Sequence, residues 1–104
     1  MQKLIRDKII EIIENEWRKV NYYICDEKEY KKSLFNKLLE EVKEVVNSNN
    51  KNELKEELAD LLEVFYSILK NENISFEEIE NIRKTKKDKK WWFDKKIILD
   101  MDGF

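Results

Sequence analysis

Acidic side chains gather in the middle of this 104-residue chain, inside an otherwise apolar stretch. Glu41 and Glu44 are three residues apart, and so are Glu57 and Asp60. A spacing of three places two side chains on one face of an α-helix, one turn apart. If two such helices pack antiparallel, four carboxylates can point toward one place. Their mutual repulsion there favours a bound cation.

The position of each acid on its predicted helix strengthens this interpretation. In projection, Glu57 falls within the apolar face of its helix, Glu41 lies at the edge of the apolar arc, and Glu44 lies further round on the same side. An acid in such a place is costly unless it is paired, hydrogen-bonded or metal-bound. Three further acids project outward and are expected to be solvated: Glu40, Glu56 and Glu63.

The residues that the chain lacks limit the possible chemistry. Without histidine, Ser–His and Cys–His nucleophilic sites, typical zinc sites and Glu-x-x-His di-iron sites are excluded. Carboxylate oxygens remain as ligands, and they suit Mg²⁺ or Mn²⁺. Because 42% of the residues are charged, acids also fall at helical spacings by chance, and a salt bridge is the alternative role for each.

The elements that must position these acids are predicted to be helical. The chain has no proline, and Gly103 is its only glycine, so strand-rich folds and glycine-rich phosphate loops are disfavoured. We expect one all-α domain over residues 1–104, with a four-helix bundle-like core and an extended C-terminal arm. The predicted helices and arm span residues 3–19, 26–47, 53–70, 75–90 and 91–104.

Local signals support these boundaries. Asp26 is a predicted N-cap, and Ser75 with Glu78 forms the pattern of a capping box. The polar residues 48–52 make a short loop, which favours antiparallel packing of the second and third helices. That packing is what the four-carboxylate hypothesis requires.

Charge and cysteine content bear on partners and location. The net charge of −2 gives no general attraction for nucleic acid, although residues 83–96 form a basic run beside Trp91 and Trp92. A single cysteine, Cys25, excludes an internal disulfide and fits a reducing cytoplasm. No apolar run approaches the length of a membrane span, and charged residues interrupt the apolar start of the chain.

The acidic pattern also resembles a known family. Glu40-Glu41-Val42-Lys43-Glu44, then twelve residues, then Glu57-Leu58-Ala59-Asp60 is similar to the motif of the MazG-like all-α nucleoside triphosphate pyrophosphohydrolases. The opening Lys3-Leu4-Ile5-Arg6-Asp7-Lys8 resembles a phosphoribosyl-ATP pyrophosphohydrolase-like branch, as do Ile82-Arg83-Lys84 and the segment from Phe93 to Leu99.

The resemblance implies a function and a site. Members of this family are helical oligomers, here expected as homodimers or homotetramers, that cleave nucleoside triphosphates between the α- and β-phosphates with Mg²⁺. It implies Glu41, Glu44, Glu57 and Asp60 as metal ligands, with Glu41 or Glu44 activating water. The implied phosphate-binding residues are basic: Arg6, Lys8, Lys84 and Lys87. For Arg6 and Lys8, a surface ion pair is the alternative.

Two departures and two alternative functions accompany this hypothesis. Ile10 replaces the usual proline of the opening motif, and Trp91 and Trp92 stand where that branch commonly has glycines. The alternatives are a non-enzymatic helical interaction module, whose acidic face pairs with the basic arm of a neighbouring subunit, and nucleic-acid binding through residues 83–96. The acidic face disfavours the second of these.

Overall fold

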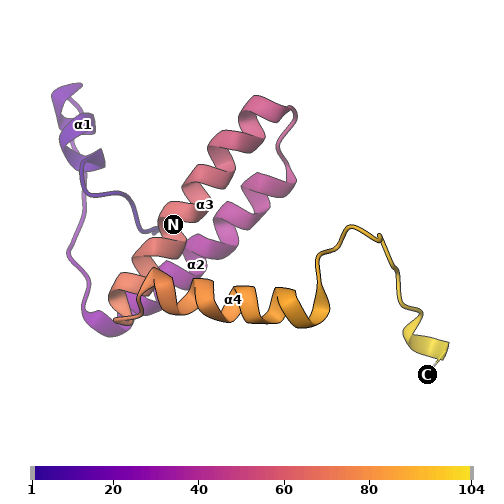
Figure 1. Ribbon diagram of the computed structural model, residues 1–104. Helices are drawn as coiled ribbons and strands as arrows, with labels where there is room; N and C mark the ends of the chain where they lie inside the picture. The colour runs from indigo at the N-terminus through magenta and orange to yellow at the C-terminus, as the bar shows by residue number, and fades with distance from the viewer. Residues whose placement is uncertain (1, 104) are drawn as a thin grey trace. The chain divides into compact units, whose positions relative to one another are not determined.

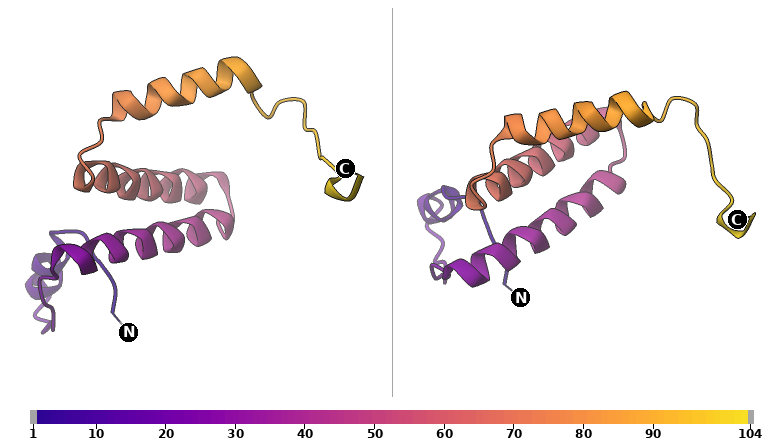
Figure 2. Two further views of the ribbon diagram at one scale, coloured as in Figure 1. Left: turned by 90° about the horizontal axis from the view of Figure 1, so that it is seen from below. Right: turned by 60° about the horizontal axis from the view of Figure 1, so that its bottom comes forward.

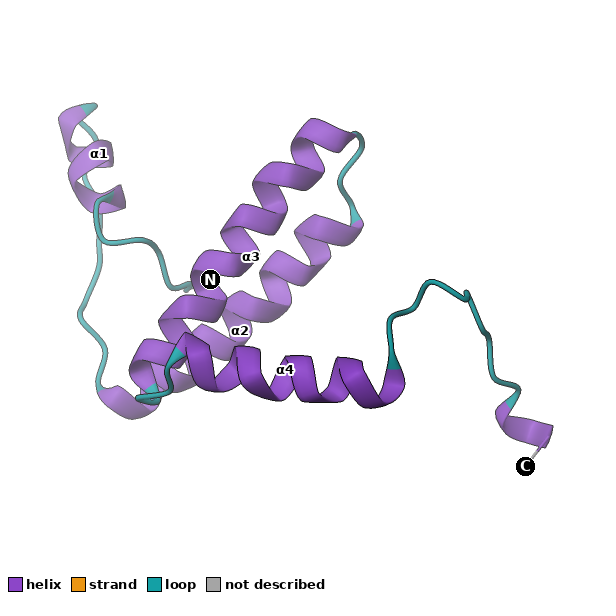
Figure 3. Cartoon of the chain, in the orientation of Figure 1, coloured by secondary structure: helices purple, strands orange, loops and turns teal. Residues whose placement is uncertain are grey.

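The computed structural model describes residues 2–103, and within this range the regular structure is entirely helical (Figure 3). This confirms the predicted all-α class. Met1 and Phe104, the ends of the predicted domain and arm, lie outside the described residues. The chain divides into two compact units between Asn73 and Ile74, and each is described by itself. The elements are α1 (Ile9–Asn15), α2 (Glu27–Val46), α3 (Lys51–Asn71), α4 (Phe76–Lys90) and a short 3₁₀ turn, η1 (Met101–Gly103).

The first unit is built on an antiparallel hairpin of α2 and α3. The two helices lie side by side in every view, joined by one short loop (Figures 1 and 2). Leu34 of α2 and Val64 and Leu69 of α3 are its buried apolar residues. They are buried because one face of each helix meets the other. The predicted antiparallel pairing is therefore confirmed.

Side-chain caps fix where the two long helices begin. The Asp26 carboxylate accepts a hydrogen bond of 2.8 Å from the Glu29 N–H, which confirms the predicted N-cap of α2. Asn50 caps α3 by accepting from the Glu53 N–H at 2.9 Å, so α3 begins at Lys51, two residues earlier than predicted. Each cap satisfies a backbone donor that the helix itself leaves unpaired.

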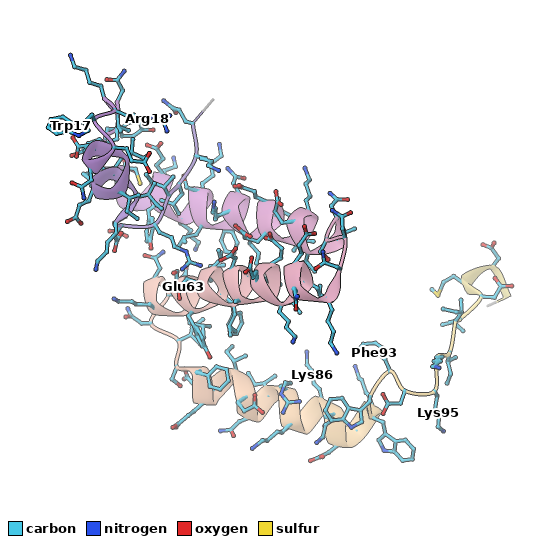
Figure 4. All side chains as sticks on the ribbon, turned by 90° about the horizontal axis from the view of Figure 1, so that it is seen from above. Trp17, Arg18, Glu63, Lys86, Phe93 and Lys95 are labelled. Atoms are coloured by element: carbon cyan, nitrogen blue, oxygen red, sulfur yellow. The ribbon has the colours of Figure 1, made fainter. Side chains whose placement is uncertain are left out.

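The first helix is much shorter than predicted, because α1 covers only Ile9–Asn15 of the expected 3–19. Residues 2–6 are not helical, and their basic side chains form ion pairs with acids of α2 and α3. At the other end, Trp17 adopts a left-handed φ of 61°, which stops the helix. Figure 4 shows Trp17 and Arg18 where the chain leaves α1. Apolar periodicity alone did not reveal these two constraints.

The second unit contains α4 and the segment that follows it. Ser75 and Glu78 form the predicted capping box, with Ser75 accepting from the Glu78 N–H and Glu78 accepting from the Ser75 N–H. No residue of α4 is buried, in keeping with its strongly basic sequence. Residues 91–100 are non-helical, as predicted for the arm, and Figure 4 shows Phe93 and Lys95 on them.

The turn after α4 has an unusual backbone for its residue type. Trp91 has φ 67° and ψ −159°, a region that is populated almost only by glycine. Ammonium groups lie over both tryptophan rings, that of Lys87 4.9 Å from the Trp92 centroid and that of Lys95 5.1 Å from the Trp91 centroid. Trp91 thus keeps a glycine-type φ at a place where the related branch commonly has glycine.

Candidate metal centre

Three carboxylates meet across the hairpin of α2 and α3. Glu41 of α2 and Glu57 and Asp60 of α3 each offer an oxygen, and these three oxygens all lie within 4.8 Å of one another. Glu41 is only 7% exposed, and the other two residues are half-buried. The spacing of three puts both α3 acids on the face that α2 covers. The structure therefore brings together three of the four predicted ligands.

Glu44, the fourth predicted ligand, is exposed and lies outside this group of three. It is still close enough to act on the group electrostatically. Loss of hydration raises the pKa of Glu57, and the negative charge of Glu44 is the next cause, followed by those of Asp60, Glu41 and Glu56. The cluster is thus a place where negative charge is unfavourable and added positive charge is stabilising.

Of the four residues predicted to bind phosphate, one contacts the acidic cluster and three lie on other helices or at their ends. The Arg6 guanidinium donates to Asp60 Oδ1 at 2.8 Å, so Arg6 reaches the cluster and forms the ion pair named as its alternative role. Lys8 is exposed at the N-cap of α1. Lys84 and Lys87 belong to α4 in the second unit. Phosphate binding by all four of these residues stays a prediction.

Lys37 is a charged neighbour of the cluster that sequence reasoning missed. Its ammonium lies 3.4 Å from both oxygens of Glu40 and 3.7 Å from Glu41 Oε1, and its side chain is 18% exposed. Its position three and four residues before two motif acids was the signal that could have identified it. Lys3 also pairs with Glu40, with its ammonium 3.3 Å from Glu40 Oε1.

Glu40 is consequently not the freely solvated acid that was predicted. It is half-buried and forms ion pairs with both lysines. Its partial loss of hydration acts to raise its pKa. The charge of Lys37 and the hydrogen bond from Lys3 outweigh this and hold the pKa below its ordinary value. Glu40 therefore stays ionised and serves as an anchor for both lysines.

A groove of about 370 Å³ opens beside the acids. Two of the three clustered carboxylates, Glu41 and Asp60, lie on its wall together with Arg6 and Lys37. The groove thus has an acidic side for a cation and basic groups for an anion. The remaining lining residues are Leu4, Ile5, Asp7, Tyr30, Leu34, Glu63, Val64, Tyr66, Ser67 and Lys70.

The donor set fits a hard divalent cation. Three carboxylates from two rigid helices supply only oxygen atoms, which Mg²⁺ and Mn²⁺ prefer. Mg²⁺ binds through a few carboxylates and keeps positions for water or phosphate oxygens, so a three-acid site leaves room for a substrate. The cluster can hold such an ion and place it at the wall of the groove.

An all-helical chain with facing acids on a helical hairpin has the features of the MazG-like all-α superfamily. Within it, a family model described as phosphoribosyl-ATP pyrophosphohydrolase matches residues 3–87. The chain belongs to this family, and a pyrophosphohydrolase activity is the function that the family supports. No curated protein and no solved structure gives a significant match to the chain.

The repulsion within the cluster predicts how one substitution changes stability. Glu57→Gln removes one of the facing charges with little change in shape, so the metal-free variant should unfold at a higher temperature than the wild type. Because the native pKa of Glu57 is raised, its charged form opposes folding at neutral pH, and the gain should shrink as the pH falls through that pKa. Thermal unfolding followed by circular dichroism in excess chelator measures both effects.

Glu56→Gln is the matched control, since Glu56 is exposed on the same helix and contributes least to the shift. It should leave the midpoint nearly unchanged. A lower midpoint for Glu57→Gln would show that the carboxylate is stabilised by its surroundings rather than repelled by them.

Proposed function

We propose that the protein is a Mg²⁺-dependent nucleotide pyrophosphohydrolase. It cleaves a nucleoside triphosphate or related nucleotide between the α- and β-phosphates, giving a monophosphate and pyrophosphate. The observation that carries this proposal is the meeting of Glu41, Glu57 and Asp60 beside a groove with basic groups. The family match gives the reaction class, and the metal and the substrate are the finer parts of the proposal. Clearing unwanted nucleotides in the cytoplasm is a role consistent with it.

Glu41, Glu57 and Asp60 would hold the ion, with Mn²⁺ as a possible substitute for Mg²⁺. When bound, such an ion neutralises phosphate charge and polarises the phosphoryl group. Glu41 is fixed by burial, and Asp60 by the Arg6 guanidinium. Held in this way, the carboxylates need little rearrangement on binding.

We assign water activation to Glu44. It is exposed and stands outside the group of three, yet its charge reaches Glu57 across the hairpin. A carboxylate in that position can accept a proton from water while the water oxygen attacks the α-phosphorus. The bond from the α-phosphorus to the α–β bridging oxygen then breaks, and pyrophosphate leaves with the electron pair. We assign the neutralisation of phosphate charge to Arg6, which lines the same groove.

Product analysis tests the reaction. We expect the purified protein with Mg²⁺ to convert at least one member of a panel of canonical, modified and phosphoribosyl nucleotides to monophosphate and pyrophosphate, as resolved by ion-exchange chromatography. Diphosphate with orthophosphate would contradict α–β cleavage. No turnover, together with no stabilisation by Mg²⁺ and a non-hydrolysable triphosphate, would favour the non-enzymatic interaction module.

Two substitutions separate metal binding from water activation. Glu44→Gln should lower kcat by about 10²–10⁴-fold, the usual contribution of a general base, and should keep Mn²⁺ binding. Glu41→Gln should weaken Mn²⁺ binding measured by calorimetry as well as turnover. Glu56→Gln is the control for an exposed acid. Loss of Mn²⁺ binding in Glu44→Gln would make Glu44 the fourth ligand instead.

Self-association as a homodimer or homotetramer is the remaining finer proposal. A stripe of apolar residues on α2 is exposed, with Leu39 at 62% and Val46 at 75% exposure. These residues are Phe35, Leu39, Val42 and Val46, spaced for one helical face, and Leu58 and Leu62 are also exposed on α3. Such a stripe is costly in water and suits burial against a second copy.

Among the helices in residues 2–103, none combines the length and apolarity that a membrane span needs.

Light scattering after size exclusion measures the association. We expect a mass of twice or four times 12.8 kDa for the wild type. Leu39→Gln should weaken association about tenfold or more, because it removes a buried leucine from each copy. Lys43→Gln, at an exposed polar position of the same helix, should leave the mass unchanged. A wild-type protein that stays at 12.8 kDa would contradict the proposal.

A further inference from the structure

Lys37 is a cation beside the acidic cluster that the proposed reaction does not yet use. Its side chain is 18% exposed, whereas that of Arg6 is 58% exposed. It lines the groove next to the acids and also a second groove of about 360 Å³, so it stands between the two. A positive charge this close to a candidate metal ligand needs a reason, because it competes with the metal.

The contacts of Lys37 differ in strength. Both Glu40 oxygens are within hydrogen-bond distance of its ammonium at 3.4 Å, while Glu41 Oε1 lies at 3.7 Å and makes only an ion pair. Glu40 is itself held by Lys3. The Lys37 ammonium is therefore hydrogen-bonded to Glu40 and more weakly paired with Glu41. A lysine has three donors, so one can turn from Glu41 to another acceptor.

We propose that Lys37 is a substrate-binding residue that contacts the phosphate chain of the nucleotide. This rests on the proposed function. With a divalent ion on Glu41, the weak ion pair to Lys37 loses its attraction, and the ammonium turns to a phosphate oxygen in the groove. Glu40 keeps the lysine in place throughout. Partial burial strengthens the contact, because charges interact more strongly away from bulk water.

This role predicts effects of opposite sign for two ligands. Removing the Lys37 charge should leave the binding of a metal ion alone unchanged or make it tighter. The reason is that a competing cation 3.7 Å from Glu41 is then absent. The same change should weaken binding of a metal–phosphate complex about tenfold or more, the usual effect of losing one hydrogen bond to a charged group. A purely structural lysine would weaken both.

The experiment uses the full-length protein and calorimetry. Lys37→Met is titrated with Mn²⁺ alone, and then with Mg²⁺ and a triphosphate whose α–β bridge is a non-hydrolysable methylene. Lys43→Met is the matched control on α2, because Lys43 is exposed. Lys37→Arg keeps the charge and should restore binding of the analogue to within a few-fold. If circular dichroism shows Lys37→Met to be unfolded, Lys37→Gln replaces it.

Each outcome decides the matter. Unchanged or tighter Mn²⁺ binding with weaker analogue binding supports phosphate contact by Lys37. Parallel loss of both, or no change in analogue binding, overturns it. An equal loss in Lys37→Arg and Lys37→Met also overturns it, since charge would then be irrelevant. If the wild type binds no Mg²⁺ analogue complex at all, the proposed function itself fails, and this assignment fails with it.

Discussion

Electrostatic repulsion across the interface of α2 and α3 is the constraint on which the rest of the structure depends. Glu41, Glu57 and Asp60 would separate if nothing opposed their charge. Apolar packing of the hairpin holds the helices together, while Arg6 and Lys37 supply positive charge to Asp60 and Glu41. A bound divalent cation would relieve the repulsion that remains. Natural sites commonly give up some stability for function in this way.

Much of the fold could be predicted because its signals are local. The capping box of Ser75 and Glu78 and the N-cap at Asp26 involve residues close in sequence, and helical periodicity marked both long helices. The first helix was overestimated because its start depends on distant contacts and its end depends on the backbone conformation of Trp17. Ion pairs to α2 and α3 hold residues 2–6 out of a helix, and the left-handed φ of Trp17 ends α1. Tertiary interactions such as these ion pairs override local preference.

The candidate site, too, could be predicted where its signals are local and could not be predicted where it depends on packing. A spacing of three identified the acids that face one another, because helical geometry converts sequence into direction. It could not distinguish Glu44 from the three converging acids, since the depth of a residue in the interface depends on how the two helices pack. The partner of Arg6 lies 54 residues away, so only the folded chain reveals that pairing. The role of Lys37 could not be predicted, because a lysine three and four residues before two acids can equally be an exposed ion pair, and only the packing of the hairpin buries its side chain.

The tryptophan that follows α4 has a consequence for the entropy of the chain. A glycine with the φ and ψ of Trp91 would be unstrained, but it would leave the unfolded chain many more conformations to lose. A tryptophan lowers that entropic cost and incurs strain of about 1–3 kcal/mol instead. The ammonium–ring contact with Lys95 offsets part of the strain, by about 0.5–1 kcal/mol for an exposed pair. Tryptophan in place of glycine thus makes the connection after α4 stiffer, although the backbone at Trp91 keeps a glycine-type conformation.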